Sequence, residues 1–97
     1  MLTYSVAKAG LNNLTQYLAR ELAPTGITVN MIAPGWIPVE RHADDPQADK
    51  DAYLASGPAA RWGIPEDVGW AAAYLSSDEA AFVTGQTIAV NGGKTVW

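Results

Sequence analysis

Residues 27–35 read Ile-Thr-Val-Asn-Met-Ile-Ala-Pro-Gly, and this stretch decides the fold class of the 97-residue chain. The segment 27–33 is rich in β-branched side chains and is largely apolar on both faces, which is typical of a short strand buried inside a parallel sheet. Pro34 and Gly35 then end the strand. We therefore predict an α/β fold with a parallel sheet.

Helices are predicted on both sides of this strand. Upstream, residues 4–22 carry apolar side chains at spacings of three and four, which places them on one stripe of a helix: Ala7, Leu11, Leu14, Leu18 and Leu22. Pro24 and Gly26 end that helix. Downstream, a second helix is expected at 65–75 and another strand at 86–90. This order implies a right-handed strand-helix-strand unit of a parallel sheet.

A long connection, residues 36–64, separates the first strand from the second helix. Its prolines and charged residues indicate a surface excursion, which we interpret as a lid over a substrate. Within it, Asp45 and Pro46 are expected to be the cap and the first position of a short helix that stops near Gly57. A lone His42 in such a charged loop is expected to be solvated, so no metal site is predicted.

The composition argues against several classes of partner. The net charge is -4 and the six Lys and Arg residues are scattered, so no basic stripe is available for nucleic acid or an anionic membrane surface. No apolar run reaches the roughly 18 residues of a membrane span, and no secretory signal pattern is present, so a cytoplasmic protein is expected. The absence of cysteine excludes disulfides and thiolate sites.

Tyr4 and Lys8 place a phenol and an ammonium one turn apart at the start of the first helix. A free tyrosine has a pKa of about 10, and a neighbouring positive charge favours its phenolate. Such a residue can give a proton to an oxygen that receives hydride, or take one from an alcohol that loses hydride. Taken alone, the same spacing also arises by chance at a solvated helix start.

Residues 4–11 resemble the catalytic helix of the short-chain dehydrogenases/reductases, and residues 27–35 resemble the strand that follows this helix in that family. Further motifs follow in the family's order, at 61–68, 74–78, 82–86 and 90–93. The resemblance covers nearly the whole chain, and this order makes coincidence negligible. It implies the C-terminal portion of a Rossmann-type doubly wound sheet, with residues 1–97 as part of a single domain.

The resemblance also implies roles for individual residues. Tyr4 would be the general acid or base, and Lys8 would lower its pKa and hold the nicotinamide ribose of NAD or NADP. Pro34, Gly35 and Ile37 would lie beside the nicotinamide. The substrate would be a small alcohol or carbonyl compound, and the intact protein would be a homo-oligomer.

One position departs from the family pattern. Many members have a threonine where this chain has Pro38, and the hydroxyl of that threonine contacts the cofactor. Since Pro38 has no hydroxyl, we expect the cofactor to be held differently at this point.

The elements needed to bind a whole dinucleotide do not occur in this sequence. It contains no G-x-G turn, and the upstream Ser and Asn that the family implies would precede residue 1. Two strands are also too few for an independently stable parallel sheet. We therefore expect the chain to be the C-terminal half of an enzyme and to be inactive alone. The alternative is a truncated, non-catalytic association module that uses the helix at 65–75 and the last strand.

Overall fold

A computed structural model describes residues 2–35, 37, 44–58 and 61–94. Along the chain, the described elements are α1 (Leu2–Leu22), the short 3-10 helix η1 (Ala23–Thr25), β1 (Met31–Pro34), α2 (Gln47–Ser56), α3 (Pro65–Leu75), the 3-10 helix η3 (Asp78–Ala80) and β2 (Thr87–Val90).

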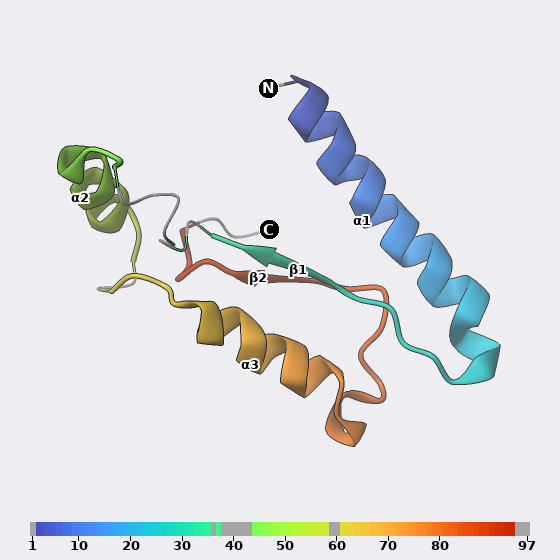
Figure 1. The fold of residues 1–97 in the computed structure, drawn as a ribbon. Helices are drawn as coiled ribbons and strands as arrows, with labels where there is room; N and C mark the ends of the chain where they lie inside the picture. Colours follow the sequence, from blue (N-terminus) through green and yellow to red (C-terminus); the bar gives the residue numbers. More distant parts are fainter. Residues whose placement is uncertain (1, 36, 38–43, 59–60, 95–97) are drawn as a thin grey trace.

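β1 and β2 form a parallel pair, with Met31 opposite Thr87 and Pro34 opposite Val90. In Figure 1, α1 lies on one side of this pair and α3 on the other. The predicted α/β class and the predicted order of helix, strand, connection, helix and strand are therefore confirmed.

Both strands are shorter than predicted, because side-chain hydrogen bonds interrupt the regular backbone ladder at their amino ends, where the Gly85 N–H still donates to the Val29 carbonyl at 2.7 Å. The Val29 N–H donates to Thr84 Oγ1 at 3.0 Å, and the Asn30 side chain donates to the Val83 carbonyl at 3.0 Å. The Gln86 N–H in turn donates to Asn30 Oδ1 at 3.1 Å. The strands consequently begin at Met31 and Thr87 rather than at residues 27 and 86. They are half-buried to exposed rather than fully buried.

The predicted apolar stripe of α1 is only partly the buried side of the helix. Thr15 and Ala19 are its buried residues. Leu18 and Leu22 of the predicted stripe are half-buried beside them, whereas Leu11 and Leu14 are about half exposed. Ala19 packs closely against Gly85, because the Ala19 Cβ lies 3.4 Å from the position that a Cβ at Gly85 would occupy. Two small residues therefore make this contact.

A hydrogen bond also ties α1 to the sheet. The Thr87 hydroxyl on β2 donates to Asn12 Oδ1 at 2.6 Å. Since Asn12 lies near the middle of α1, this bond joins the helix that carries Tyr4 to the strand that ends at the pocket described below.

The short helix predicted inside the long connection is confirmed, but its cap is not at Asp45. Pro46 is the residue that caps α2, with an extended ψ of 134°, and the helix ends at Ser56 before Gly57. The Pro46 carbonyl accepts the N–H groups of Asp49 and Lys50. The start of α2 therefore depends on the backbone of Pro46 and not on a carboxylate.

Candidate functional site

A pocket of about 270 Å³ lies at the carboxyl ends of β1 and β2. Its wall includes residues that follow the two strands and residues at the start of α3: Gly35, Ile37, Arg61, Gly63, Asp67 and Asn91. In open α/β sheets, ligands bind outside the carboxyl ends of the strands. The position of the pocket therefore fits a ligand site of this fold class.

Gly35 is the point of closest packing in the pocket wall. A Cβ at this position would lie 2.8 Å from the Tyr53 hydroxyl oxygen, 2.9 Å from Asn91 Cβ and 3.0 Å from Asn91 Cα. The Gly35 N–H, directly after the last residue of β1, also donates to the Val90 carbonyl at 2.9 Å. Because Asn91 Cα belongs to the backbone, it cannot move aside, and only glycine fits here without a shift.

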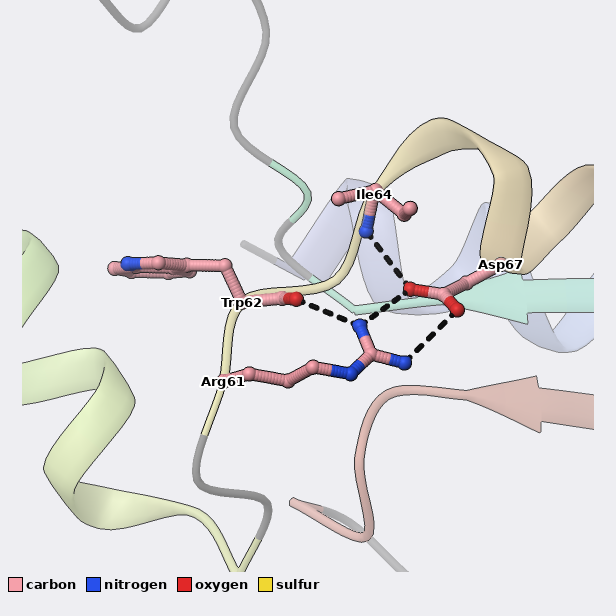
Figure 2. Close-up of polar contacts among 4 residues, drawn as sticks. All are labelled: Arg61, Trp62, Ile64 and Asp67. Carbon is pink, nitrogen blue, oxygen red and sulfur yellow. Dashed lines mark hydrogen bonds and ion pairs between the residues drawn. The ribbon is translucent and has the colours of Figure 1, made fainter.

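Arg61 and Asp67 form a two-point ion pair at the amino end of α3 (Figure 2). Arg61 Nη1 donates to Asp67 Oδ2 at 2.9 Å, and Nη2 donates to Oδ1 at 3.0 Å. Nη1 also donates to the Trp62 carbonyl at 2.8 Å, and the Ile64 N–H donates to Asp67 Oδ2 at 2.8 Å. One carboxylate thus binds both the preceding arginine and the backbone of the first helical turn.

These bonds keep both groups charged. The hydrogen bonds from Arg61, together with the one from the Ile64 N–H, lower the pKa of Asp67 to about 2. The hydrogen bond to Asp67 raises the pKa of Arg61 above its ordinary value. The ion pair is therefore intact throughout the physiological pH range.

Three segments meet beside the pocket in a stack that consists of Trp62, Tyr53 and Lys94. The rings of Tyr53 and Trp62 are nearly parallel, with 5.4 Å between their centres and 4° between their planes. The ammonium nitrogen of Lys94 lies 4.8 Å from the centre of the Tyr53 ring, and it also donates to the hydroxyl of Ser56. α2 is thereby joined to the residues before α3 and to the residues after β2.

Tyr4 and Lys8 lie together on the first two turns of α1. The ammonium nitrogen of Lys8 is 5.4 Å from the centre of the Tyr4 ring, and Tyr4 is 57% exposed. α1 begins on the side of the sheet toward which both strands run, which is also the side of the pocket (Figure 1). The part of the pocket wall that the structure describes nevertheless contains neither residue.

The sequence-predicted site residues are therefore only partly brought together. Gly35 and Ile37 line one pocket, while Pro34 is the exposed last residue of β1. Pro38 and His42 lie outside the described residues.

Sequence reasoning missed the parts that Arg61, Asp67, Tyr53 and Asn91 play around the pocket. Arg61 and Asp67 lie within the motif at 61–68, and their opposite charges, six positions apart, were the sequence signal that could have predicted an ion pair. Tyr53 lies in a segment interpreted only as a charged lid.

The comparisons with known proteins agree with one another. The family described as Enoyl-(Acyl carrier protein) reductase matches residues 1–95. The 3-oxoacyl-(acyl-carrier-protein) reductase FabG of Escherichia coli is 46% identical over 90 residues, which are 93% of this chain and 37% of the relative. The FabG of Pseudomonas aeruginosa is 44% identical over 90 residues, which are 93% of this chain and 36% of the relative.

A solved structure shares the fold. It is a 4-hydroxyisoleucine dehydrogenase complexed with NADH, with a TM-score of 0.82 and 34% identity over 95% of this chain and 37% of that chain. The chain thus spans little more than a third of the length of the relatives that it matches. Among the described residues, no helix is long and apolar enough to cross a membrane.

Proposed function

Because this chain belongs to the short-chain dehydrogenase/reductase family, we propose that it supplies the proton-transfer residues of an NAD(P)-dependent oxidoreductase. The intact protein would move hydride between a nicotinamide and an alcohol or carbonyl substrate. The observation that carries this proposal is the position of the Lys8 ammonium, 5.4 Å from the centre of the Tyr4 ring, at the start of α1.

In the proposed mechanism, Tyr4 exchanges the proton that balances the hydride. Its hydroxyl donates a proton to the oxygen of a carbonyl that is being reduced, or its phenolate accepts one from an alcohol that is being oxidised. The Lys8 ammonium lies over the Tyr4 ring, on the same side of α1 as the group that would exchange the proton. Tyr4 is more than half exposed in this chain, so the remaining part of the enzyme would have to shield it from water.

The residues of the pocket fit the nicotinamide end of NAD or NADP. Gly35 and Ile37 both line the pocket, and Ile37 gives it an apolar wall, which suits the face of a flat ring. We expect Pro34, Gly35 and Ile37 to hold the nicotinamide and Lys8 to bind its ribose. When bound, the cofactor would supply or accept the hydride. The solved relative contains NADH, which supports a nicotinamide cofactor.

The substrate class rests on the relatives. Two of them reduce 3-oxoacyl groups by name, and the third is named as a dehydrogenase of a hydroxylated amino acid. Each of these names describes an interconversion of a carbonyl and an alcohol. We therefore propose an alcohol or carbonyl substrate without choosing between an acyl thioester and a smaller molecule.

A chimera tests the proposal. The segment of the Escherichia coli relative that aligns with this chain is replaced by the matching residues of this chain. The absorbance of NADH or NADPH is then followed with a 3-oxoacyl thioester and with a panel of small alcohols and ketones. We expect turnover of at least one substrate. A folded chimera that binds the dinucleotide but turns over none of these substrates would contradict the proposal.

A second candidate, a non-catalytic association module, is favoured by one observation. Trp70 and Tyr74 on α3 are 65% and 52% exposed, and Phe82 after η3 is fully exposed. Large aromatic side chains gathered on one helix and the following turn are common at subunit interfaces. Sedimentation of the purified chain tests this reading, which requires a dimer or larger assembly that Trp70→Ser weakens. A monomer at high concentration would count against it.

A further inference from the structure

We propose that Arg61 and Asp67 are positioning residues, which hold α2 against the pocket wall at Gly35 through the Trp62 and Tyr53 rings. The link to substrate handling rests on the function proposed above, because the pocket is the same one. The contacts themselves involve neither cofactor nor substrate, so the positioning can be tested without them.

The ion pair fixes the backbone before α3. The guanidinium holds the Trp62 carbonyl and both oxygens of Asp67, while Asp67 also holds the Ile64 N–H. A two-point arginine-carboxylate contact defines orientation as well as distance. The direction in which the chain presents Trp62 is therefore set by the pair.

Trp62 contacts α2 through ring stacking on Tyr53. In Figure 2 the Trp62 ring points away from the ion pair, and its partner in the stack is Tyr53 of α2. The ammonium of Lys94 lies near the Tyr53 ring as well, which adds an electrostatic contact. A change in the orientation of Trp62 therefore moves or releases the Tyr53 ring.

Tyr53 extends from α2 to Gly35 in the pocket wall. Its hydroxyl oxygen lies 2.8 Å from the position that a Cβ of Gly35 would occupy. Gly35 is part of the pocket wall, so Tyr53 brings a side chain of α2 against this wall. The chain of contacts from Asp67 to Gly35 is thus continuous.

The solvent exposure of Arg61 indicates that the ion pair orients the chain more than it stabilises the fold. The Arg61 side chain is 66% exposed, and exposed ion pairs add little to the free energy of unfolding. The Asp67 side chain is only 15% exposed, so its direction is well defined. Loss of the pair should therefore affect α2 and the Tyr53 ring before it affects the sheet.

Nuclear magnetic resonance on the chimera described above, isotope-labelled, tests this inference. Asp67→Asn is compared with Glu66→Gln, which removes a carboxylate from the same helical turn but leaves the ion pair in place. In Asp67→Asn we expect the Tyr53 ring protons to lose the shift caused by stacking on Trp62. We also expect the α2 amides to exchange about tenfold faster, with α3 and sheet amides unchanged.

Two further variants complete the test. Arg61→Lys keeps the charge but loses the two-point contact, and we expect an intermediate effect on the Tyr53 ring. Trp62→Leu should release Tyr53 while the titration of the Asp67 carboxylate stays unchanged. The inference is overturned if Tyr53 and α2 are unaffected in Asp67→Asn, if Glu66→Gln has the same effect, or if Asp67→Asn unfolds the sheet together with α2. None of these outcomes bears on Tyr4, whose role is tested separately by turnover.

Discussion

The ammonium nitrogen of Lys8 lies 5.4 Å from the centre of the Tyr4 ring, one turn further along α1. The two side chains therefore lie on the same face of the helix, as their spacing predicts. The function proposed for this chain depends on this relationship, because Tyr4 would exchange the proton and Lys8 would bind the nicotinamide ribose beside it.

Asp67 should titrate far below an ordinary carboxyl group. Its pKa in the folded chain is about 2, against an ordinary value of 3.8. Since folding lowers this pKa, the stabilising contribution is complete above about pH 4 and is lost as the pH falls toward 2. The carboxyl carbon resonance of Asp67 measures this directly, and Arg61→Met should move its midpoint upward. A midpoint near 4 in the unsubstituted chain would contradict the ion pair.

Gly35→Ala should destabilise the chain by about 1–3 kcal/mol. The new Cβ would meet Asn91 Cα at 3.0 Å, and this backbone atom cannot rotate away. Gly69→Ala is the matched control, because a Cβ at Gly69 in α3 meets nothing within 4 Å. That control should gain roughly 0.5–1 kcal/mol from helix propensity. Urea denaturation of the chimera compares the two substitutions, and equal effects would show that the pocket wall is not closely packed.

Thr87→Val should cost about 1 kcal/mol, because it removes the hydrogen bond between β2 and α1. In a double-mutant cycle with Asn12→Ala, the two losses should be less than additive. Additive losses would mean that the Thr87 hydroxyl and the Asn12 side chain do not interact. The cycle thus measures how firmly the helix that carries Tyr4 is attached to the sheet.

The purified 97-residue chain should not oxidise NADH or NADPH with any carbonyl substrate. Its sequence contains no G-x-G turn with which to bind a pyrophosphate. Absorbance of the reduced nicotinamide, followed with a panel of ketones and 3-oxoacyl thioesters, provides the measurement. Clear turnover by the chain alone would require another way of holding the dinucleotide.

Local signals in the sequence located the helices well. α3 begins at Pro65 and ends at Leu75 as predicted, because proline at the first position and acidic residues in the first turn are strong markers of a helix start. The end of α1 at Leu22 was likewise marked by the proline and glycine that follow it.

The errors occurred where distant segments interact. The starts of both strands depend on Asn30 and Thr84, whose side-chain hydrogen bonds interrupt the backbone ladder across more than fifty residues of sequence. The buried residues of α1 are the small residues Thr15 and Ala19, so a search for large apolar side chains found only the neighbouring, half-buried Leu18 and Leu22. Neither effect leaves a periodic pattern in the sequence.

The candidate site also combines features with a local sequence signal and features without one. The contact between Tyr4 and Lys8 could be predicted from their spacing, and the place of Gly35 at the end of β1 could be predicted from the motif at 27–35. The stack of Trp62, Tyr53 and Lys94 cannot be read from the sequence, because it forms only when α2 and the residues after β2 come together. The roles of Arg61 and Asp67 likewise depend on the turn that brings them within 2.9 Å of each other.

The turnover number of the chimera with Tyr4→Phe directly tests whether Tyr4 is the proton-transfer residue. Tyr17→Phe is the control, since Tyr17 is an exposed tyrosine on the same helix. We predict that Tyr4→Phe lowers kcat by about 10²–10⁴-fold, while Tyr17→Phe leaves it within about twofold of the parent. If the Tyr4→Phe chimera binds the dinucleotide and turns over substrate as fast as the Tyr17→Phe control, Tyr4 is not the proton-transfer residue.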